Sequence, residues 1–117
     1  MFKPLNTFRG GKNKMSKKTM KLLAESAPIF NMLQDDNRQQ ILLLLFDKHA
    51  LSVTELTDQL SLSRPAVSHH LKLLLDAGLI SFQKNGKERI YRLNLEPSYN
   101  LLKSLLNSLE HDMKMMS

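Results

Sequence analysis

The chain has 117 residues, a length that predicts one domain with a modest hydrophobic core. Its 17 Lys and Arg residues exceed its 11 Asp and Glu residues and give a formal net charge of +6, which favours a polyanionic partner. Because the chain contains no cysteine, disulfides, thiolate metal sites and thiol redox sensing are excluded. The longest apolar run, Ile41 to Phe46, is too short to span a membrane, and the N-terminus has no secretion signal, so we expect no membrane partner and a cytoplasmic location.

Positive charge is concentrated in two stretches of the chain. Residues 1–21 carry seven basic and no acidic residues, and residues 61–93 carry six basic and two acidic ones. Residues 1–18 show no sustained hydrophobic periodicity, so we predict a flexible basic arm there, followed by a single domain over residues 19–117. The arm either lies along nucleic-acid phosphates or is a solvated tail without a specific role.

Residues 19–34 predict the first helix, because their apolar residues recur at three- and four-residue steps. Pro28 is expected to interrupt or kink this helix, and Ser26 is placed to cap a second segment.

The next helix is expected over residues 37–48, with Asp35 and Asp36 at its positive end. Its run from Ile41 to Phe46 is apolar around the whole circumference. Such a helix has to be covered on every side, so we predict that it is the central core helix.

Two further helices are joined by a short turn. Ser52 and Glu55 form an S-x-x-E capping box in front of a short helix over residues 53–60, which follows an extended link. The turn over residues 61–63 then leads into a helix over residues 64–77. Two short helices with a tight turn between them are typical of a helix-turn-helix.

The helix over residues 64–77 has clear start and stop signals and two different faces. Ser63 is its N-cap, Pro65 lies in its first turn, and Gly78 is placed to end it in a left-handed conformation. One face is apolar and carries Val67, Leu71, Leu74 and Leu75, and the other carries Pro65, Ser68, His69, Lys72 and Asp76.

A basic hairpin follows over residues 79–93, because Asn85-Gly86 between two strand-like runs is the strongest short hairpin signal. A helix with a polar face and a basic hairpin together indicate binding to double-stranded DNA. We predict that base edges are contacted by Arg64, Pro65, Ser68 and His69, and that phosphates are contacted by Ser63, Lys72 and the wing residues Lys84, Lys87 and Arg89. The alternative is a solvated hairpin face without a DNA contact.

Histidines are the remaining candidate metal ligands. His69 and His70 point about 100° apart on a helix and cannot chelate one ion, and we expect His70 to be packed and hydrogen-bonded. Glu110-His111-Asp112 is the acid and histidine cluster of the last helix, but no second ligand stands three or four residues beyond His111. We therefore predict no metal site and no cofactor, and leave open whether His111 takes part in a site shared across a dimer.

The last helix starts at Glu96-Pro97 and carries more apolar surface than a domain of this size needs for its own core. This surplus predicts a homodimer. We assign its interface to Leu23 and Phe30 of the first helix and to Leu101, Leu102, Leu105, Leu106, Leu109 and Met113 of the last.

Several stretches together resemble the ArsR/SmtB-type winged-helix repressors. They are residues 34–45, Val53-Thr54-Glu55-Leu56, residues 68–74, Ala77-Gly78-Leu79-Ile80 and Tyr91-Arg92-Leu93. The resemblance implies a homodimer that is joined by its first and last helices, binds an imperfect palindrome and leaves it when a signal arrives. Metal-responsive members often carry Cys-x-Cys in the first helix of the helix-turn-helix, whereas this chain has Ser52-Val53-Thr54-Glu55 there, so the signal is expected to be a non-thiol effector.

The sequence therefore predicts a mainly α (α+β) fold, a winged helix-turn-helix with a two-stranded wing, and a DNA-binding transcriptional regulator, most simply a repressor. A scaffold module without specific DNA binding and a MarR-type regulator are the alternatives. The spacings support no Ser/His/acid arrangement, glycine-rich phosphate loop or paired acids, so we do not expect an enzyme.

Overall fold

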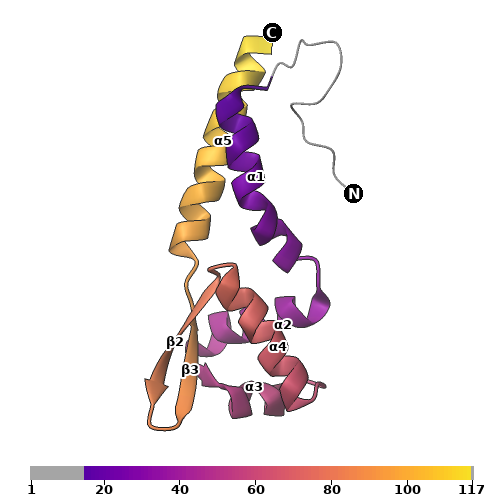
Figure 1. Ribbon diagram of the computed structural model, residues 1–117, viewed down its shortest axis with the longest axis vertical. Coiled ribbons are helices and arrows are strands. Elements are labelled where there is room, and N and C mark those ends of the chain that lie inside the picture. The colour runs from indigo at the N-terminus through magenta and orange to yellow at the C-terminus, as the bar shows by residue number, and fades with distance from the viewer. Residues whose placement is uncertain (1–14, 117) are drawn as a thin grey trace. The chain divides into compact units, whose positions relative to one another are not determined.

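The computed structural model describes residues 15–116 and confirms a winged helix-turn-helix (Figure 1). In chain order its elements are α1 (Lys17–Met32), α2 (Asp36–Lys48), β1 (Leu51–Ser52), α3 (Val53–Gln59), α4 (Arg64–Asp76), β2 (Ile80–Asn85), β3 (Glu88–Leu93) and α5 (Glu96–Met116). Of the predicted basic arm, residues 1–14 lie outside the described residues. Lys17 and Lys18 form the start of α1, two residues earlier than the expected start of the first helix.

Internal contacts divide the chain into two compact units. The central unit comprises Pro28–Ser98, and the terminal unit joins the described residues up to Ala27 with those from Tyr99 onward. The boundaries lie within α1 and α5. The central unit contains the whole helix-turn-helix and the wing.

The core of the central unit is made of hydrocarbon side chains. Its fully buried members are Ile41 and Leu45 of α2, Leu56 of α3, and Val67, Leu71 and Leu74 of α4. Helix α4 packs against both α2 and α3, and β2 and β3 close the core with Ile80 and Tyr91. The polar face of α4 therefore points outward, because Val67, Leu71 and Leu74 of its apolar face are buried.

The prediction that α2 is covered on every side is wrong. Its buried face is a single stripe formed by Ile41 and Leu45, one helical turn apart, while Leu43 and Phe46 remain 66% and 70% exposed. The helix contacts α4 and β3 along that stripe. A continuous apolar run places hydrophobic side chains all around a helix, but the neighbouring elements reach only one side of it.

The predicted cap at Ser26 is also wrong. Helix α1 continues from Lys17 to Met32 with Pro28 inside it. The Ser26 hydroxyl donates to the Leu22 carbonyl oxygen at 2.7 Å, which is the back-bonding of a serine within a helix. The cap of α1 is Ser16, whose hydroxyl oxygen accepts from the Thr19 backbone N–H at 3.1 Å.

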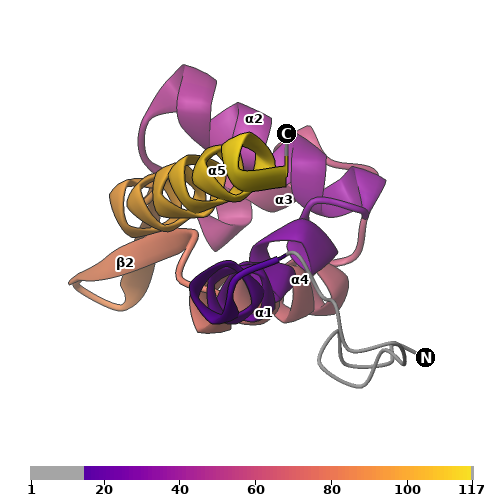
Figure 2. The ribbon, with the colours of Figure 1, turned by 90° about the horizontal axis from the view of Figure 1, so that it is seen from above.

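The predicted two-stranded wing is confirmed as β2 and β3, and β1 adds a third antiparallel strand to give the order β1-β3-β2. The third is β1, which pairs Leu51 with Tyr91 and Ser52 with Ile90 at the base of the hairpin. Strands β2 and β3 project beyond the helices of the central unit, and their turn lies farthest out (Figure 1, Figure 2). Gly86 takes a φ of +65° in this turn, as a tight hairpin requires.

The terminal unit is held by polar contacts between α1 and α5. The Asp112 carboxylate accepts from the Ser16 backbone N–H at 2.9 Å, and the hydroxyls of Thr19 and Ser108 are hydrogen-bonded to each other. Thr19, Ser108 and Asp112 are all buried. Hydrogen bonds from the Thr19 hydroxyl and the Ser16 N–H lower the pKa of Asp112.

Candidate nucleic-acid interface

Helix α4 begins and ends where the sequence indicates. Ser63 is the N-cap, with its side chain accepting from the Ala66 N–H at 3.3 Å, and Pro65 lies in the first turn. After the C-cap Ala77, Gly78 takes a φ of +78° and ends the helix. The Leu79 N–H donates to the Leu74 carbonyl oxygen, so the chain leaves the helix directly toward β2.

The predicted capping box is present at the start of α3, the first helix of the helix-turn-helix. The Glu55 N–H donates to the Ser52 hydroxyl oxygen at 3.1 Å, and the Ser52 N–H donates to the Glu55 carboxylate at 2.9 Å. Since Leu56 of α3 is fully buried, α3 is fixed at its start and through its core face. This arrangement leaves the first residues of α4 at the surface of the central unit.

All residues predicted to contact base edges are exposed along one face of α4. These are Arg64, Pro65, Ser68 and His69. Arg64 has a partner that the sequence did not indicate, since its Nη1 donates to the Thr54 hydroxyl of α3 at 2.8 Å. A neutral hydroxyl fixes the guanidinium without cancelling its charge, so Arg64 remains able to bind an anion or a base edge.

The predicted phosphate contacts on α4 differ in their surroundings. Ser63 is occupied as the helix cap, although it stays exposed. Lys72 forms an exposed ion pair with Asp76 one turn later, with Nζ and Oδ2 3.2 Å apart. Exposed pairs of this kind are weak, but the carboxylate offsets the lysine charge locally. Lys72 is therefore a less available cation than Arg64.

The wing presents its basic residues at the outer part of the hairpin. Lys84, Lys87 and Arg89 are all exposed, and Lys84 and Arg89 stand directly opposite each other in the pairing of β2 with β3. The Arg89 guanidinium carbon lies 4.4 Å from the centroid of the Phe82 ring. As with Arg64, the partner of this guanidinium carries no charge.

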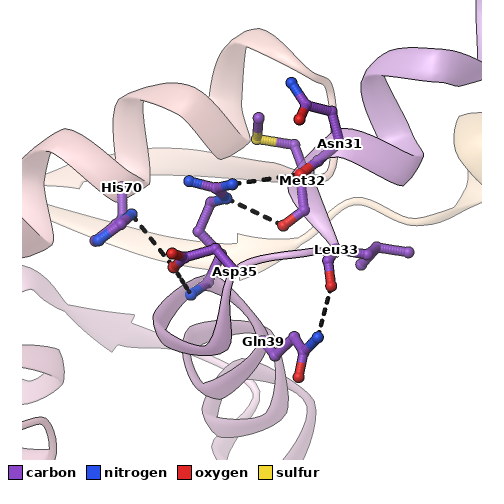
Figure 3. A network of polar contacts seen from close by, with 7 residues as sticks. Asn31, Met32, Leu33, Asp35, Gln39 and His70 are labelled. Carbon is purple, nitrogen blue, oxygen red and sulfur yellow. Dashed lines mark hydrogen bonds and ion pairs between the residues drawn. The ribbon is translucent and has the colours of Figure 1, made fainter.

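His70 lies on the inner side of α4 and faces the start of α2 (Figure 3). Its side chain is 15% exposed, and its Nδ1 lies 3.9 Å from Asp35 Oδ2. The expectation of a packed side chain is confirmed, but Nδ1 has no hydrogen-bond partner within residues 15–116. At this distance the two atoms are too far apart for a hydrogen bond.

Asp35 belongs to a network that fixes the junction of α1 and α2 (Figure 3). Its carboxylate accepts from the Arg38 N–H at 3.0 Å, and the Arg38 Nε donates to the Met32 carbonyl oxygen at 3.0 Å. The pKa of the Asp35 carboxyl is lowered, and the main cause is the hydrogen bond that it accepts from the Arg38 backbone N–H. Sequence reasoning placed Asp35 at the positive end of α2 but did not find its contact with α4.

The described residues do not fit a metal centre. Within residues 15–116 no three His, Cys, Asp or Glu side chains lie close enough together to hold an ion. His111 is exposed on α5, while the neighbouring Asp112 is buried and occupied by hydrogen bonds. None of the helices in this part of the chain has the length and hydropathy needed to cross a membrane.

Comparison with known proteins agrees with this geometry. The profile of the bacterial regulatory proteins of the arsR family matches residues 35–81, which run from the α2 cap through the helix-turn-helix. The HTH-type transcriptional regulator YuzN of Bacillus subtilis is 41% identical over 81 residues, which cover 64% of this chain and 88% of the relative. The chain belongs to the ArsR family.

Two further relatives extend the comparison. The arsenical resistance operon repressor of Staphylococcus xylosus is 38% identical over 72 residues, covering 62% of this chain and 68% of the relative. Among solved structures, an ArsR-like transcriptional regulator from Rhodococcus sp. RHA1 superposes with a TM-score of 0.69 at 30% identity, covering 82% of this chain and 88% of the other. The protein is thus a transcriptional regulator that binds DNA, in a family of regulators that are not enzymes.

Proposed function

We propose that the protein is a homodimeric repressor that inserts α4 into the major groove of a palindromic operator and places its wing on the flanking DNA. The observation that carries this proposal is the exposed face of α4, because Arg64, Ser68 and His69 stand outward while Val67 and Leu71 on the opposite face are fully buried. A helix anchored in this way can present a fixed set of side chains to base edges.

The dimeric state is supported by the apolar surface of α5. Leu106 and Met113 are 63% and 58% exposed, and Leu101, Leu102 and Leu109 are only half-buried. Hydrophobic surface of this extent on one helix is typical of a protein interface. A two-fold axis would place two copies of α4 about one DNA turn, roughly 34 Å, apart, as a palindromic site requires.

The releasing signal that we propose is a non-thiol effector. Although one relative is named as an arsenical resistance repressor, this chain has no cysteine to bind arsenite. In place of a thiol, the Ser52 hydroxyl caps α3 and the Thr54 hydroxyl binds Arg64. Both groups are therefore engaged in structural hydrogen bonds.

The test is a selection of bound sequences from a random DNA pool, followed by binding measurements on the selected operator. We expect a palindromic consensus, and we expect His69→Ala to lose about 1–3 kcal/mol of discrimination at its contacted base pair. Lys87→Ala should weaken all sequences alike and reduce the salt dependence, whereas Lys48→Ala, an exposed lysine of α2, is the charge-matched control and should not. Binding without sequence preference would contradict the proposal and favour a scaffold module.

A further inference from the structure

The wing contains a stack of three side chains that runs from the core to the surface. Tyr91 of β3 is buried, and its ring centroid lies 5.6 Å from that of Phe82, its cross-strand partner on β2. Phe82 is 38% exposed. Its ring in turn carries the Arg89 guanidinium, 4.4 Å from the ring centroid. The exposed cation is thereby connected through two aromatic rings to the core of the central unit.

The position of Arg89 is not explained by pairing with an acid. Its cross-strand partner is Lys84, and like charges directly opposite each other destabilise a hairpin. The adjacent Glu88 pairs with Asn85 and lies on the other face of the strand, because side chains alternate along β3. No ion pair involves Arg89 among residues 15–116. The arginine therefore keeps its full positive charge beside a second cation.

We propose that Phe82 is a positioning residue that holds Arg89 ready to enter the minor groove of the DNA flanking the operator. This inference rests on the proposed DNA-binding function and adds a specificity element to it. A narrow minor groove has an enhanced negative potential that attracts arginine, and A·T-rich tracts are the sequences that narrow it. The adjacent charges of Lys84 and Arg89, unfavourable in the free hairpin, are complementary to such a groove.

The aromatic ring contributes by limiting the freedom of a long side chain before DNA is bound. An arginine without a partner has to be ordered upon binding, and that ordering weakens the affinity. A guanidinium already resting on a ring face loses less freedom, and the ring does not compete for its charge as a carboxylate would. The wing therefore reads the width of the minor groove, while α4 reads base edges in the major groove.

The test is a double-mutant cycle measured on two operators that share the same central sequence, one with A·T flanks and one with G·C flanks. We expect the wild type to prefer A·T flanks and Arg89→Ala to lose this preference. Phe82→Leu, which keeps the apolar volume without an aromatic face, should reduce affinity for the A·T-flanked operator by about two- to fivefold. In the Arg89→Ala background, Phe82→Leu should have no further effect, because the ring acts through the arginine.

Two controls separate positioning from a general effect on the fold. Phe82→Tyr keeps the ring and should restore most of the flank preference. Phe46→Leu changes an exposed phenylalanine on α2 and should leave binding unchanged. Thermal unfolding followed by circular dichroism checks that each variant is folded.

Several outcomes would overturn the inference. Equal effects of Phe82→Leu with and without Arg89 would show that the ring serves only the hairpin, and a uniform loss on both operators would assign Arg89 to phosphate binding. Failure of the wild type to bind any operator with sequence preference would instead refute the proposed function. The two failures are therefore distinguishable.

Discussion

The two units of the chain bury different kinds of side chain. The fully buried side chains of the central unit are aliphatic, and they hold α2, α3 and α4 together. The terminal unit buries Thr19, Ser26, Ser108 and Asp112, and within the described residues Leu105 is its only buried hydrophobic side chain. Meanwhile Leu106 and Met113 of the same helix α5 stay exposed. Exposed hydrophobic side chains occur in the central unit as well, where Leu43 and Phe46 are exposed, so the two units differ in what they bury.

This difference indicates a division of tasks. An aliphatic core is favourable on its own, because each buried side chain is removed from water without a requirement for a specific partner. Buried hydroxyls and carboxylates contribute little net stability, but they demand one particular arrangement of their hydrogen bonds. We infer that the central unit is stable through its own core, and that the hydrogen bonds of the terminal unit fix the register of α1 on α5.

The largest effect is expected from a cavity in the central core. Leu71→Ala removes a fully buried side chain of α4 and should lower the free energy of unfolding by about 2–5 kcal/mol. Leu43→Ala is the matched control on the exposed face of α2 and should change it by less than about 0.5 kcal/mol. Urea denaturation measures both, and similar losses for the two variants would show that the exposed face of α2 is covered in solution.

The second effect concerns the apolar surface of the terminal unit. Leu106→Glu should dissociate the proposed dimer, as measured by sedimentation at micromolar concentration. It should weaken operator binding by at least about tenfold, since the two half-sites are no longer bound by one particle. Asn107→Glu adds the same charge to an exposed neighbouring position on α5 and is expected to remain dimeric. A dimeric Leu106→Glu protein would contradict the proposed interface.

The third effect is a pH dependence of the terminal unit. The pKa of Asp112 is lowered from its ordinary value of 3.8, so its carboxylate stabilises the folded state above about that pH. This contribution is lost as the pH falls through the lowered pKa of the folded state. Asp112→Asn should therefore be less stable than the wild type at neutral pH, and the two stabilities should converge in acid.

Urea denaturation at a series of pH values measures this convergence. Glu110→Gln, on the exposed side of the same helix, serves as the control and should retain wild-type stability at neutral pH. A constant difference between wild type and Asp112→Asn from neutral to strongly acidic pH would show that the charge of Asp112 has no role.

The smallest effect compares hydroxyl groups in the two units. Thr54 uses its hydroxyl at the surface to hold Arg64, whereas Thr19 uses its hydroxyl in a buried cluster. Thr54→Val should leave stability nearly unchanged but reduce discrimination between operator bases by about 0.5–1.5 kcal/mol, the worth of one hydrogen bond. Thr54→Ser keeps the hydroxyl and should retain the discrimination of the wild type. Competition binding on mutated operators measures this discrimination. An undiminished base preference in Thr54→Val would contradict the role proposed for the Thr54 hydroxyl.

Local sequence signals predicted the elements that form the candidate DNA-binding surface. Ser63 and Gly78 bound α4 because capping depends on the few residues at the helix end. The Asn85-Gly86 signal located the hairpin for the same reason, but the turn lies one residue later than expected, at Gly86-Lys87, because Asn85 ends β2 and pairs with Glu88. The outward position of Ser68 and His69 then followed from helical periodicity alone.

Features that depend on distant neighbours were not predictable in this way. Which side of α2 is buried depends on where α4 and β3 lie, so the exposure of Phe46 had no local signature. The bond between the Thr19 and Ser108 hydroxyls joins positions 89 residues apart. The partners of Arg64 and Arg89 likewise come from other elements, although cross-strand pairing could have suggested the aromatic pair next to Arg89 once the hairpin register was assumed.

Ser52 ends β1 and caps α3, so one residue belongs both to the sheet and to the helix-turn-helix. Its pairing with Ile90 on β3 ties the base of the wing to the start of α3. The strand pair and the helix cap thus both restrict movement of the base of the wing relative to α3, which packs against α4. In the proposed complex, with α4 in the major groove and the wing on the flanking DNA, the spacing between these two contacts is therefore set by the fold. We expect an operator whose flanking contacts are moved by one base pair to bind more weakly, because the wing cannot follow them.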